Sequence, residues 1–459
     1  MGLLPFLSAQ DGQPTEIGSA DATILVSETT PAQVVEEEAA LDSGNTAWML
    51  TATALVLFMT PGLAIFYGGM VRAKSALNMM MMSFAAIGVT TIIWVLYGYS
   101  LAFGKSNGGL IGNFDHIGLS NTLDQVTGAE GHQIPVLAFA MFQLTFAIIT
   151  VALLSGAIAD RAKYGSWVLF VAVWVTLVYI PIAHWAFASQ GGNGGWIIDK
   201  LGALDFAGGT VVEINSGAAA LALALVLGKR DGFRRDPMRP HNMPLVLLGA
   251  GMLCFGWFGF NAGSALSAGS LAATAMINTQ IASAAASMSW ILFEKYRDGK
   301  ATTLGVASGA IAGAVVITPA CGYINPLGAL LLGLIAGVAA CYAVSRKYKF
   351  GYDDSLDVVG VHGIGGVIGM LGIGLLATQT VNNTGQEGLF INGSFELLTH
   401  QVIAIVAVAA FSFTATWLIA TAISRTIGFR VLRDDELTGL DTTYHAESAY
   451  DITGNSNRY

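Results

Sequence analysis

The chain has 459 residues, of which 54% are hydrophobic and only 11% are charged, and its formal net charge is −9. Soluble domains carry about 25% charged residues, so this composition excludes an ordinary soluble fold and predicts a polytopic membrane protein. The negative balance also argues against a nucleic-acid partner.

The first 45 residues are acidic, contain no Lys or Arg and are rich in Ser, Thr, Glu and Ala. Such a composition predicts a disordered tail. The segment lacks the basic n-region of a secretory signal, although the start MGLLPF leaves open the remnant of a weak signal.

Apolar segments fill residues 46–427. A run of about 20 apolar residues spans the roughly 30 Å hydrocarbon core as a helix. We predict an all-α fold with eleven transmembrane helices, at residues 46–67, 77–103, 135–159, 165–187, 210–228, 243–262, 271–293, 302–318, 325–345, 356–377 and 398–424.

Nearly all basic residues fall on one side of the predicted membrane. All of the 21 Lys and Arg except Lys105 and Lys200 fall in the odd-numbered loops between helices or after the last helix. The positive-inside rule therefore predicts an external N-terminus and a cytoplasmic C-terminus. An odd number of helices agrees with this orientation.

Glycine spacing predicts close helix packing. Gly305, Gly309 and Gly313 repeat every four residues, as do Gly365 and Gly369, and small residues at this interval let helices approach closely in lipid. Residues 398–427 contain no glycine, which predicts a last helix lying along the outside of the bundle.

Two ionisable residues lie inside apolar segments: Glu213 in residues 208–228 and His362 in residues 356–376. A charge at the bilayer centre costs at least roughly 2.5–3.5 kcal/mol, so such residues are functional candidates. Helices one to five run from outside to inside overall, and helices six to ten run back again. This topology predicts an inverted repeat, with the functional site between the two halves. Glu213 on the fifth helix and His362 on the tenth then occupy corresponding positions. Each follows an aspartate near the start of its helix, Asp205 before Glu213 and Asp357 before His362.

Several long motifs resemble the ammonium transporter family (Amt/Mep/Rh), on its Amt branch. They are FMTPGLAIFYGGMVR (58–72), YIPIAHW (179–185), ALDFAGGTVVEIN (203–215), GWFGFNAGSA (256–265), TPACGYI (318–324) and DVVGVHGIGG (357–366). The resemblance implies a homotrimer with one pore in each subunit. It also implies the eleven helices and the external N-terminus that the loops predict.

The resemblance assigns residues along this pore. Phe142, Phe187 and Ser264 align with an external vestibule that recruits the cation, although the family usually has tryptophan where Phe187 stands. Phe146 and Phe260 align with stacked rings that close the outer pore. Without the resemblance, each phenylalanine is better explained as ordinary core.

His362 matches the second of two facing histidines in the family, and Glu213 occupies the first position, as in some fungal members. We interpret Glu213 and His362 as a coupled pair that relays the ammonium proton. The alternative for His362 is a satisfied packing residue. Asp205 is interpreted as a structural brace before its helix.

A dry pore can select ammonium over K⁺, which has similar size and charge. Ammonium can lose a proton, and because its pKa lies somewhat below the ~10.4 of a lysine, this costs roughly 3 kcal/mol at pH 7. Neutral NH₃ then crosses an apolar tunnel that rejects ions. No His or Cys spacing indicates a metal, and no nucleotide or nucleophile motif indicates a cofactor or an enzyme.

Residues 428–459 resemble the family's cytoplasmic tail, with GLD (439–441) and HAESAY (445–450). The resemblance implies contacts with a neighbouring subunit and docking of a PII signal protein, against the alternative of a solvated tail with one amphipathic turn. We predict ammonium transport across the plasma membrane of a prokaryotic cell. The alternatives are an ammonium receptor and an electroneutral NH₃ channel.

Overall fold

The computed structural model describes residues 41–128 and 131–450. Most of the predicted N-terminal tail therefore lies outside the described residues. The first helix begins at Ser43, slightly earlier than predicted, because the Asp42 carboxylate accepts a hydrogen bond of 2.9 Å from the backbone N–H of Asn45. Such an N-cap satisfies a free donor of the first turn.

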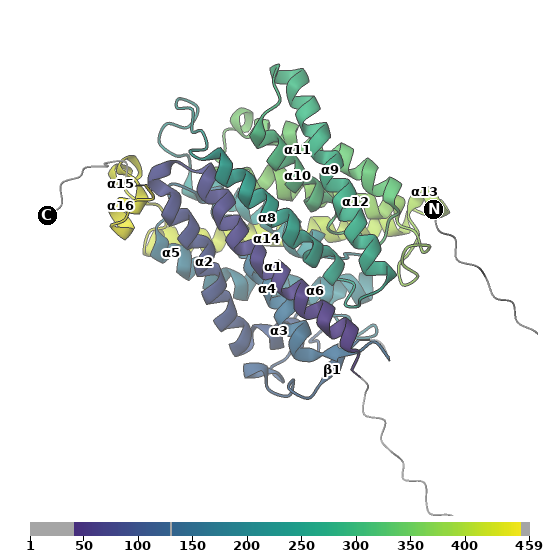
Figure 1. The fold of residues 1–459 in the computed structure, drawn as a ribbon. Coiled ribbons are helices and arrows are strands. Elements are labelled where there is room, and N and C mark those ends of the chain that lie inside the picture. The colour runs from purple at the N-terminus through teal and green to yellow at the C-terminus, as the bar shows by residue number, and fades with distance from the viewer. Residues whose placement is uncertain (1–40, 129–130, 451–459) are drawn as a thin grey trace, which may run out of the picture. The chain divides into compact units, whose positions relative to one another are not determined.

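Helices occupy all eleven predicted positions (Figure 1). They are α1 (Ser43–Met70), α2 (Ala76–Ile93) with η2 (Trp94–Gly98) and α3 (Tyr99–Phe103), α4 (Val136–Leu154) with η4 (Ser155–Ile158), α5 (Tyr164–Trp174) with η5 (Val175–Tyr179) and α6 (Ile180–Phe187), η7 (Gly209–Ile214) with α7 (Asn215–Leu227), α8 (Met243–Gly263), α9 (Ser270–Asp298), α10 (Thr303–Ile317), α11 (Pro326–Phe350), η8 (Val359–Gly363) with α12 (Ile364–Leu376), and α14 (Glu396–Thr426). The turns η2, η5, η7 and η8 are π-helical, and η4 is a 3₁₀ turn.

The connections carry short elements. These are the 3₁₀ turns η1 (Ala73–Ser75) and η3 (Ile117–Leu119), the π turn η6 (Trp196–Leu201), the helices α13 (Leu389–Asn392), α15 (Arg433–Thr438) and α16 (Leu440–His445), and the strands β1 (Val126–Thr127) and β2 (Ile134–Pro135). The two strands are antiparallel, with Val126 opposite Pro135.

Nine of the helical segments in the described part of the chain are long and apolar enough to cross a bilayer. Of the remaining two, α10 has only 15 residues, and α9 includes the polar run Asn278, Thr279 and Gln280. Both pack against neighbouring helices, α9 against α10 and α11, and α10 also against α8. The predicted all-α membrane fold is confirmed, and α9 and α10 complete its eleven helices.

Glycines set the closest helix contacts, as their spacing predicted. A Cβ atom on Gly313 of α10 would lie 2.2 Å from the carbonyl oxygen of Ala282 on α9. A Cβ atom on Gly369 of α12 would lie 2.2 Å from the carbonyl oxygen of Val316 on α10. Only glycine fits at these separations, so the four-residue repeats do mark close packing.

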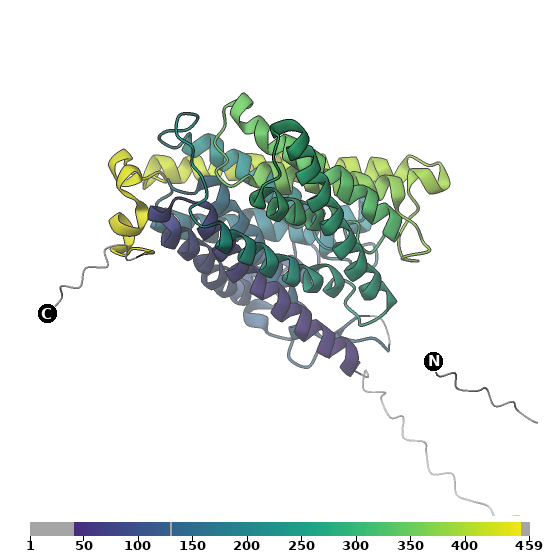
Figure 2. The same cartoon turned by 45° about the horizontal axis from the view of Figure 1, so that its top comes forward.

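The last long helix, α14, runs along one side of the bundle (Figure 2). It packs against α7 and α12, and only 28% of its most apolar stretch is buried within the chain. This position confirms the outer helix that its lack of glycine predicted.

The tail after α14 packs on the ends of helices of its own chain. The Asp441 carboxylate accepts hydrogen bonds from the backbone N–H groups of Leu77 and Asn78 at 3.0 and 2.8 Å, at the start of α2. Asn242 donates to the Tyr450 hydroxyl at 3.0 Å. These polar contacts hold the described part of the tail against its own chain, although most of its side chains between residues 431 and 450 are exposed.

A buried arginine fixes the loop that precedes η8. Arg161 is 0% exposed, and its guanidinium donates to the Ala157 and Asp353 carbonyl oxygens at 3.0 and 2.6 Å and to the Ser355 hydroxyl at 2.7 Å. Burial lowers the pKa of Arg161 to about 10, with Asp353 acting against that shift, so the group stays charged at neutral pH. Arg161 thereby connects the end of η4 to residues 353–355.

Replacing Arg161 by Met is expected to destabilise the protein by roughly 3–5 kcal/mol, because it leaves buried acceptors without a donor. The thermal unfolding midpoint in detergent should fall by several degrees. Arg425→Met is the matched control, since Arg425 is exposed in the last turn of α14. Equal midpoints for the two variants would contradict the bracing role of Arg161.

Candidate functional site

Glu213 and His362 meet inside the helical bundle. The Nδ1 atom of His362 lies 2.7 Å from Oε2 of Glu213, and this hydrogen bond joins η8 to η7. Glu213 is 0% and His362 5% exposed, and Oε1 of Glu213 has no hydrogen-bond partner among the described residues. Two ionisable residues from separate apolar segments thus form one acid–base pair.

The two halves of the chain present this pair in the same way. Glu213 and His362 are each the second-last residue of a π turn, and each turn leads into a 13-residue α-helix, α7 or α12. Single π turns are rare and frequently lie at functional sites. Their recurrence in the fifth and tenth helical segments supports the predicted inverted repeat.

An aspartate eight residues before each member of the pair caps its turn. Asp205 accepts hydrogen bonds from the backbone N–H groups of residues 208–210 at 2.6–2.8 Å. Asp354 accepts one from Val359 at 2.8 Å. A carboxylate at the N-terminus of a helix is favourable because it meets free N–H groups and the positive end of the dipole.

The sequence predicted Asp357 as the counterpart of Asp205 in the second half of the chain, and this prediction is wrong. It has a left-handed backbone, with φ of 66°, and its carboxylate pairs with Lys347 at 2.6 Å. The counterpart is Asp354. It precedes His362 by eight residues, as Asp205 precedes Glu213, and this shared spacing was the signal in the sequence that could have identified it. Burial raises the pKa of Asp354 to about 6, opposed by the charge of Lys347.

Glycines let α7 and η8 cross closely. A Cβ atom on Gly217 would lie 2.2 Å from the Cα of Gly363, whereas one on Gly363 would lie 3.3 Å from the Cα of Gly217. A Cβ atom on Gly366 would lie 2.8 Å from the Cβ of Glu213. The distance between the acid and the base therefore depends on the absence of side chains at this crossing.

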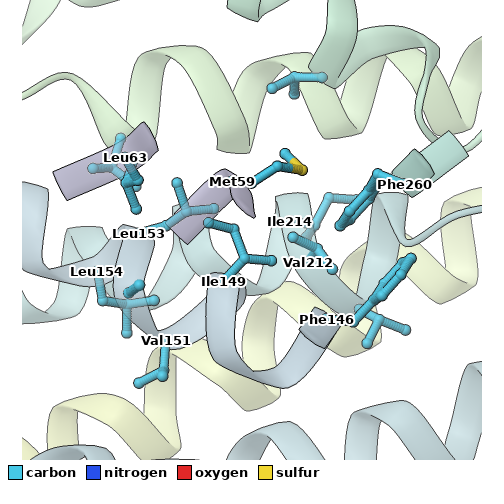
Figure 3. Packing of buried hydrophobic residues seen from close by; sticks show 14 of the residues in the cluster. Met59, Leu63, Phe146, Ile149, Val151, Leu153, Leu154, Val212, Ile214 and Phe260 are labelled. Carbon is cyan, nitrogen blue, oxygen red and sulfur yellow. The ribbon is translucent and has the colours of Figure 1, made fainter. Parts of the chain in front are cut away.

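Phe146 and Phe260 stack face to face, as Figure 3 shows, with ring centroids 4.0 Å apart and an interplanar angle of 14°. They come from α4 and α8, and both are about 1% exposed. The apolar side chains of Met59, Ile149 and Val212 lie near them in the same view. Of the two rings, Phe260 lines the cavity that contains the acid–base pair.

The residues aligned with the vestibule surround this stack. Phe142 lies with its ring centroid 4.9 Å from that of Phe146, and Phe187 lies 6.3 Å from it. Ser264 donates a hydrogen bond of 2.9 Å to the carbonyl oxygen of Phe260. Phe142 is buried, whereas Phe187 and Ser264 are half-buried.

Trp185 and His184, which lie close to Phe187 in the sequence, form hydrogen bonds outside this group of residues. The Trp185 indole donates to the Leu110 carbonyl oxygen at 2.8 Å. His184 is buried, with its ring nitrogens 2.8 Å from the Ser106 hydroxyl and from the Ala102 carbonyl oxygen. Trp185 therefore does not take the position where the family has tryptophan, and His184 is a satisfied packing residue.

A narrow cavity of about 30 Å³ extends from Phe260 past the pair to Asp357. Its apolar lining residues are Met59, Leu63, Phe66, Met70, Ile149, Leu153, Val212, Leu253, Trp257, Ile311, Leu356 and Val361. The space holds about two water-sized molecules. The lining of this cavity is therefore largely apolar around the Glu213–His362 pair.

Sequence reasoning missed Tyr67, whose side chain lines this cavity. A tyrosine within an apolar helix is usually core, so composition alone gave no signal. Its spacing of eight residues from Met59 and four from Leu63 was the available signal, because residues three or four apart share a helix face.

Comparisons with known proteins give one consistent result. Residues 47–450 match the Ammonium Transporter Family. An ammonium transporter of Mycobacterium tuberculosis is 52% identical over 433 residues, covering 90% of this chain and 91% of its own length. The structure of Mep2 from Saccharomyces cerevisiae has a TM-score of 0.79 and 34% identity, over 86% of this chain and 91% of Mep2. A Sensor Amt Protein has the same TM-score at 29% identity, over 87% and 98% of the two chains.

Proposed function

Because the chain belongs to the ammonium transporter family, we propose that it moves ammonium across the cell membrane by deprotonation. NH₄⁺ binds at an external vestibule, loses its proton and passes as NH₃ through the apolar cavity, while Glu213 and His362 relay the proton. The observation that carries this proposal is the 2.7 Å hydrogen bond between these two side chains in an otherwise largely apolar passage.

Selectivity follows from the dryness of the passage. An ion that enters an apolar cavity loses its hydration without replacement, which costs far more than moving a neutral molecule. NH₄⁺ avoids this cost by leaving its proton behind, for roughly 3 kcal/mol at pH 7. K⁺ has no such route, so the stacked rings of Phe146 and Phe260 together with the cavity reject it.

The acid–base pair can hold the proton without exposing a full charge to the cavity. In one state, neutral His362 accepts a hydrogen bond from the Glu213 carboxylic acid, and in the other the imidazolium donates to the carboxylate. Both states have the same net charge, so the pair titrates as one unit. A proton taken from NH₄⁺ on one side can therefore be released on the other, and net positive charge moves with NH₃.

Reconstituted vesicles distinguish this mechanism from its rivals. The native chain should show both ammonium uptake and an ammonium-evoked current. Uptake without current would indicate an electroneutral NH₃ channel. Binding without uptake or current would indicate a receptor, which the similarity to a Sensor Amt Protein keeps as the second candidate.

Recruitment of the cation is proposed for Phe142, Phe187 and Ser264. A cation over an aromatic face gains about 0.5–2 kcal/mol, and tryptophan binds better than phenylalanine. Phe187→Trp is therefore expected to lower the half-saturation concentration for ammonium by about 2–5-fold, equivalent to 0.5–1 kcal/mol. Uptake against concentration measures this change.

Phe187→Leu is the matched control for that variant. It keeps an apolar side chain of similar reach but has no aromatic face, so its half-saturation concentration should rise. If the Trp and Leu variants change the value in the same direction, cation–π recruitment at this position is wrong.

We also propose a homotrimer with one pore in each subunit. Gln280 is exposed near the middle of α9, beside the exposed side chains of Met276, Ile277 and Ala284. A polar amide facing lipid is unfavourable, and interhelical contacts commonly cover such groups. Mass measurement of the detergent-solubilised protein by light scattering tests the trimer.

The proposed location is the plasma membrane of a prokaryotic cell, with the N-terminus outside and the tail in the cytoplasm. The basic loops support this orientation. We propose a PII signal protein as a partner at the cytoplasmic face, where α15 and α16 would lie beside its docking surface. Binding of purified PII protein to vesicles of each orientation tests both statements.

A further inference from the structure

Three large apolar side chains project from the connection between α12 and α14. Phe390, Ile391 and Phe395 are 69%, 49% and 66% exposed, and together we call them the outer patch. The first two belong to α13, and Phe395 stands directly before α14. Clustered apolar side chains that remain exposed mark a surface that contacts another apolar phase or molecule.

The packing of the chain fixes the direction in which the outer patch projects. The N–H of Gly388, just before α13, donates a hydrogen bond of 2.8 Å to the Ala377 carbonyl oxygen. A Cβ atom on Gly388 would lie 2.6 Å from the carbonyl carbon of Leu375, so α13 starts directly against the end of α12. The N–H of Ser394 donates to the Asn392 side chain at 2.8 Å and closes the turn into α14. The exposure of the outer patch is therefore a property of the packed fold.

The other side of this connection is bound to its own chain. Gln386 donates a hydrogen bond of 3.1 Å to the Gly202 carbonyl oxygen. On α14, Gln401 donates to the Leu204 carbonyl oxygen at 2.7 Å and accepts from the Leu204 N–H at 2.9 Å. The polar side of the connection thus faces the segment that leads into η7, and the outer patch is its exposed apolar side.

The outer patch continues the outward face of α14. On that helix Val402, Ile403 and Val406 are 42%, 43% and 61% exposed. Phe395 precedes them by seven, eight and eleven residues, and such spacings place it on the same helix face. In Figure 1, α13 lies at one end of the bundle, and α15 and α16 lie at the other. The surface that α14 offers to lipid therefore reaches the outer patch at this end.

The length of α14 places the outer patch at the membrane surface. Its 31 residues extend about 46 Å at 1.5 Å per residue. The hydrocarbon core is roughly 30 Å thick, so both ends of α14 reach the headgroup region even with the usual tilt of about 20°. In the orientation that the basic loops support, the start of α14 and α13 lie on the outer side.

The charges near the outer patch favour an uncharged partner. No Lys or Arg occurs between residues 350 and 424, and the nearest charged residues in the sequence are Glu387 and Glu396. Two carboxylates and no cation disfavour anionic headgroups, because like charges repel. A short element with one apolar side suits the boundary between headgroups and acyl chains, where amphipathic segments bury that side.

We propose that the outer patch inserts into the outer leaflet at the boundary between headgroups and acyl chains. The partner is the apolar part of the bilayer surface and not a particular anionic lipid. The connection between α12 and α14 is then a membrane-surface anchor and not a loop in water.

A nitroxide label attached at Phe390→Cys tests the proposal in the full chain, reconstituted in phosphatidylcholine vesicles. The label is introduced together with Cys254→Ser, since Cys321 and Cys341 are buried and Cys254 is half-buried. Collisions of the label with oxygen, which concentrates among acyl chains, are compared with collisions with a water-soluble nickel chelate.

The matched control is a label at Asn383→Cys, because Asn383 is exposed in the same connection. The ratio of oxygen to nickel collisions at position 390 should exceed that at position 383 by at least about threefold, as burial at the acyl boundary requires. Adding phosphatidylglycerol to the vesicles should leave this difference unchanged.

Equal ratios at the two positions would place the outer patch in water and overturn the proposal. An immobilised label that neither reagent reaches would mean that a second copy of the chain covers the patch, which also overturns it. A raised ratio that appears only with phosphatidylglycerol would contradict the uncharged partner. Phe395→Cys gives a second reading if the Phe390 variant does not fold, and a ratio there equal to the control contradicts insertion.

Discussion

Glu213→Gln is expected to reduce the ammonium-evoked current by about 10²-fold or more, the size of effect typical for a positioned proton-transfer group. Glutamine keeps the shape of the side chain and can keep the 2.7 Å hydrogen bond to Nδ1 of His362. It cannot gain or lose a proton at neutral pH, so the pair loses its second protonation state. Current measured on supported proteoliposome membranes checks this result.

The informative control for this variant is Glu213→His. An imidazole can accept and release a proton, so this variant should retain a substantial current where the glutamine variant does not. If glutamine supports the native current, Glu213 does not carry the proton. If neither variant conducts while both bind ammonium, the effect of the substitutions is on structure and not on proton transfer.

Gly217→Ala is expected to be the most disruptive single-methyl change near the site. Its Cβ atom would lie 2.2 Å from the Cα of Gly363, a backbone atom that cannot rotate away. Helix α7 and the turn η8 must separate, which lengthens the Glu213–His362 contact and costs roughly 1–3 kcal/mol of stability. Transport should be lost and the unfolding temperature in detergent should fall.

Gly363→Ala provides the reciprocal control at the same crossing. Its Cβ atom would lie 3.3 Å from the Cα of Gly217, so a small adjustment is enough and most transport should remain. Similar losses in both variants would mean that the crossing tolerates no added atom on either side. In that case the asymmetry of the packing has no functional effect.

Loop charges and hydrophobic lengths predicted the helix order well because lipid imposes simple requirements on a spanning segment. Hydrophobicity was less informative for α9, where Asn278 and Thr279 are buried by neighbouring helices. The side chains that make the site come together only through tertiary packing. For Glu213 and His362, the position in corresponding segments and the family motif predicted the pair.

Other features could not be obtained from composition. The π turns η7 and η8 have no sequence signature, although they decide which way Glu213 and His362 point. Asp354 was overlooked because Asp357 lies nearer to His362, and only the repeated spacing of eight residues separates them. The tail was expected to contact a neighbouring subunit, whereas the structure shows Asp441 in contact with α2 of its own chain.

The two π turns are alike in structure, but one carries a carboxylate and the other an imidazole. Identical residues at both positions would present the same barrier to a proton from either side. In the proposed relay, unlike residues give the shared proton a preferred resting side, so the forward and reverse barriers differ in height. Inward and outward currents at equal and opposite driving force then differ, so the current–voltage curve rectifies. Its zero-current potential is unchanged, since only the gradients determine it.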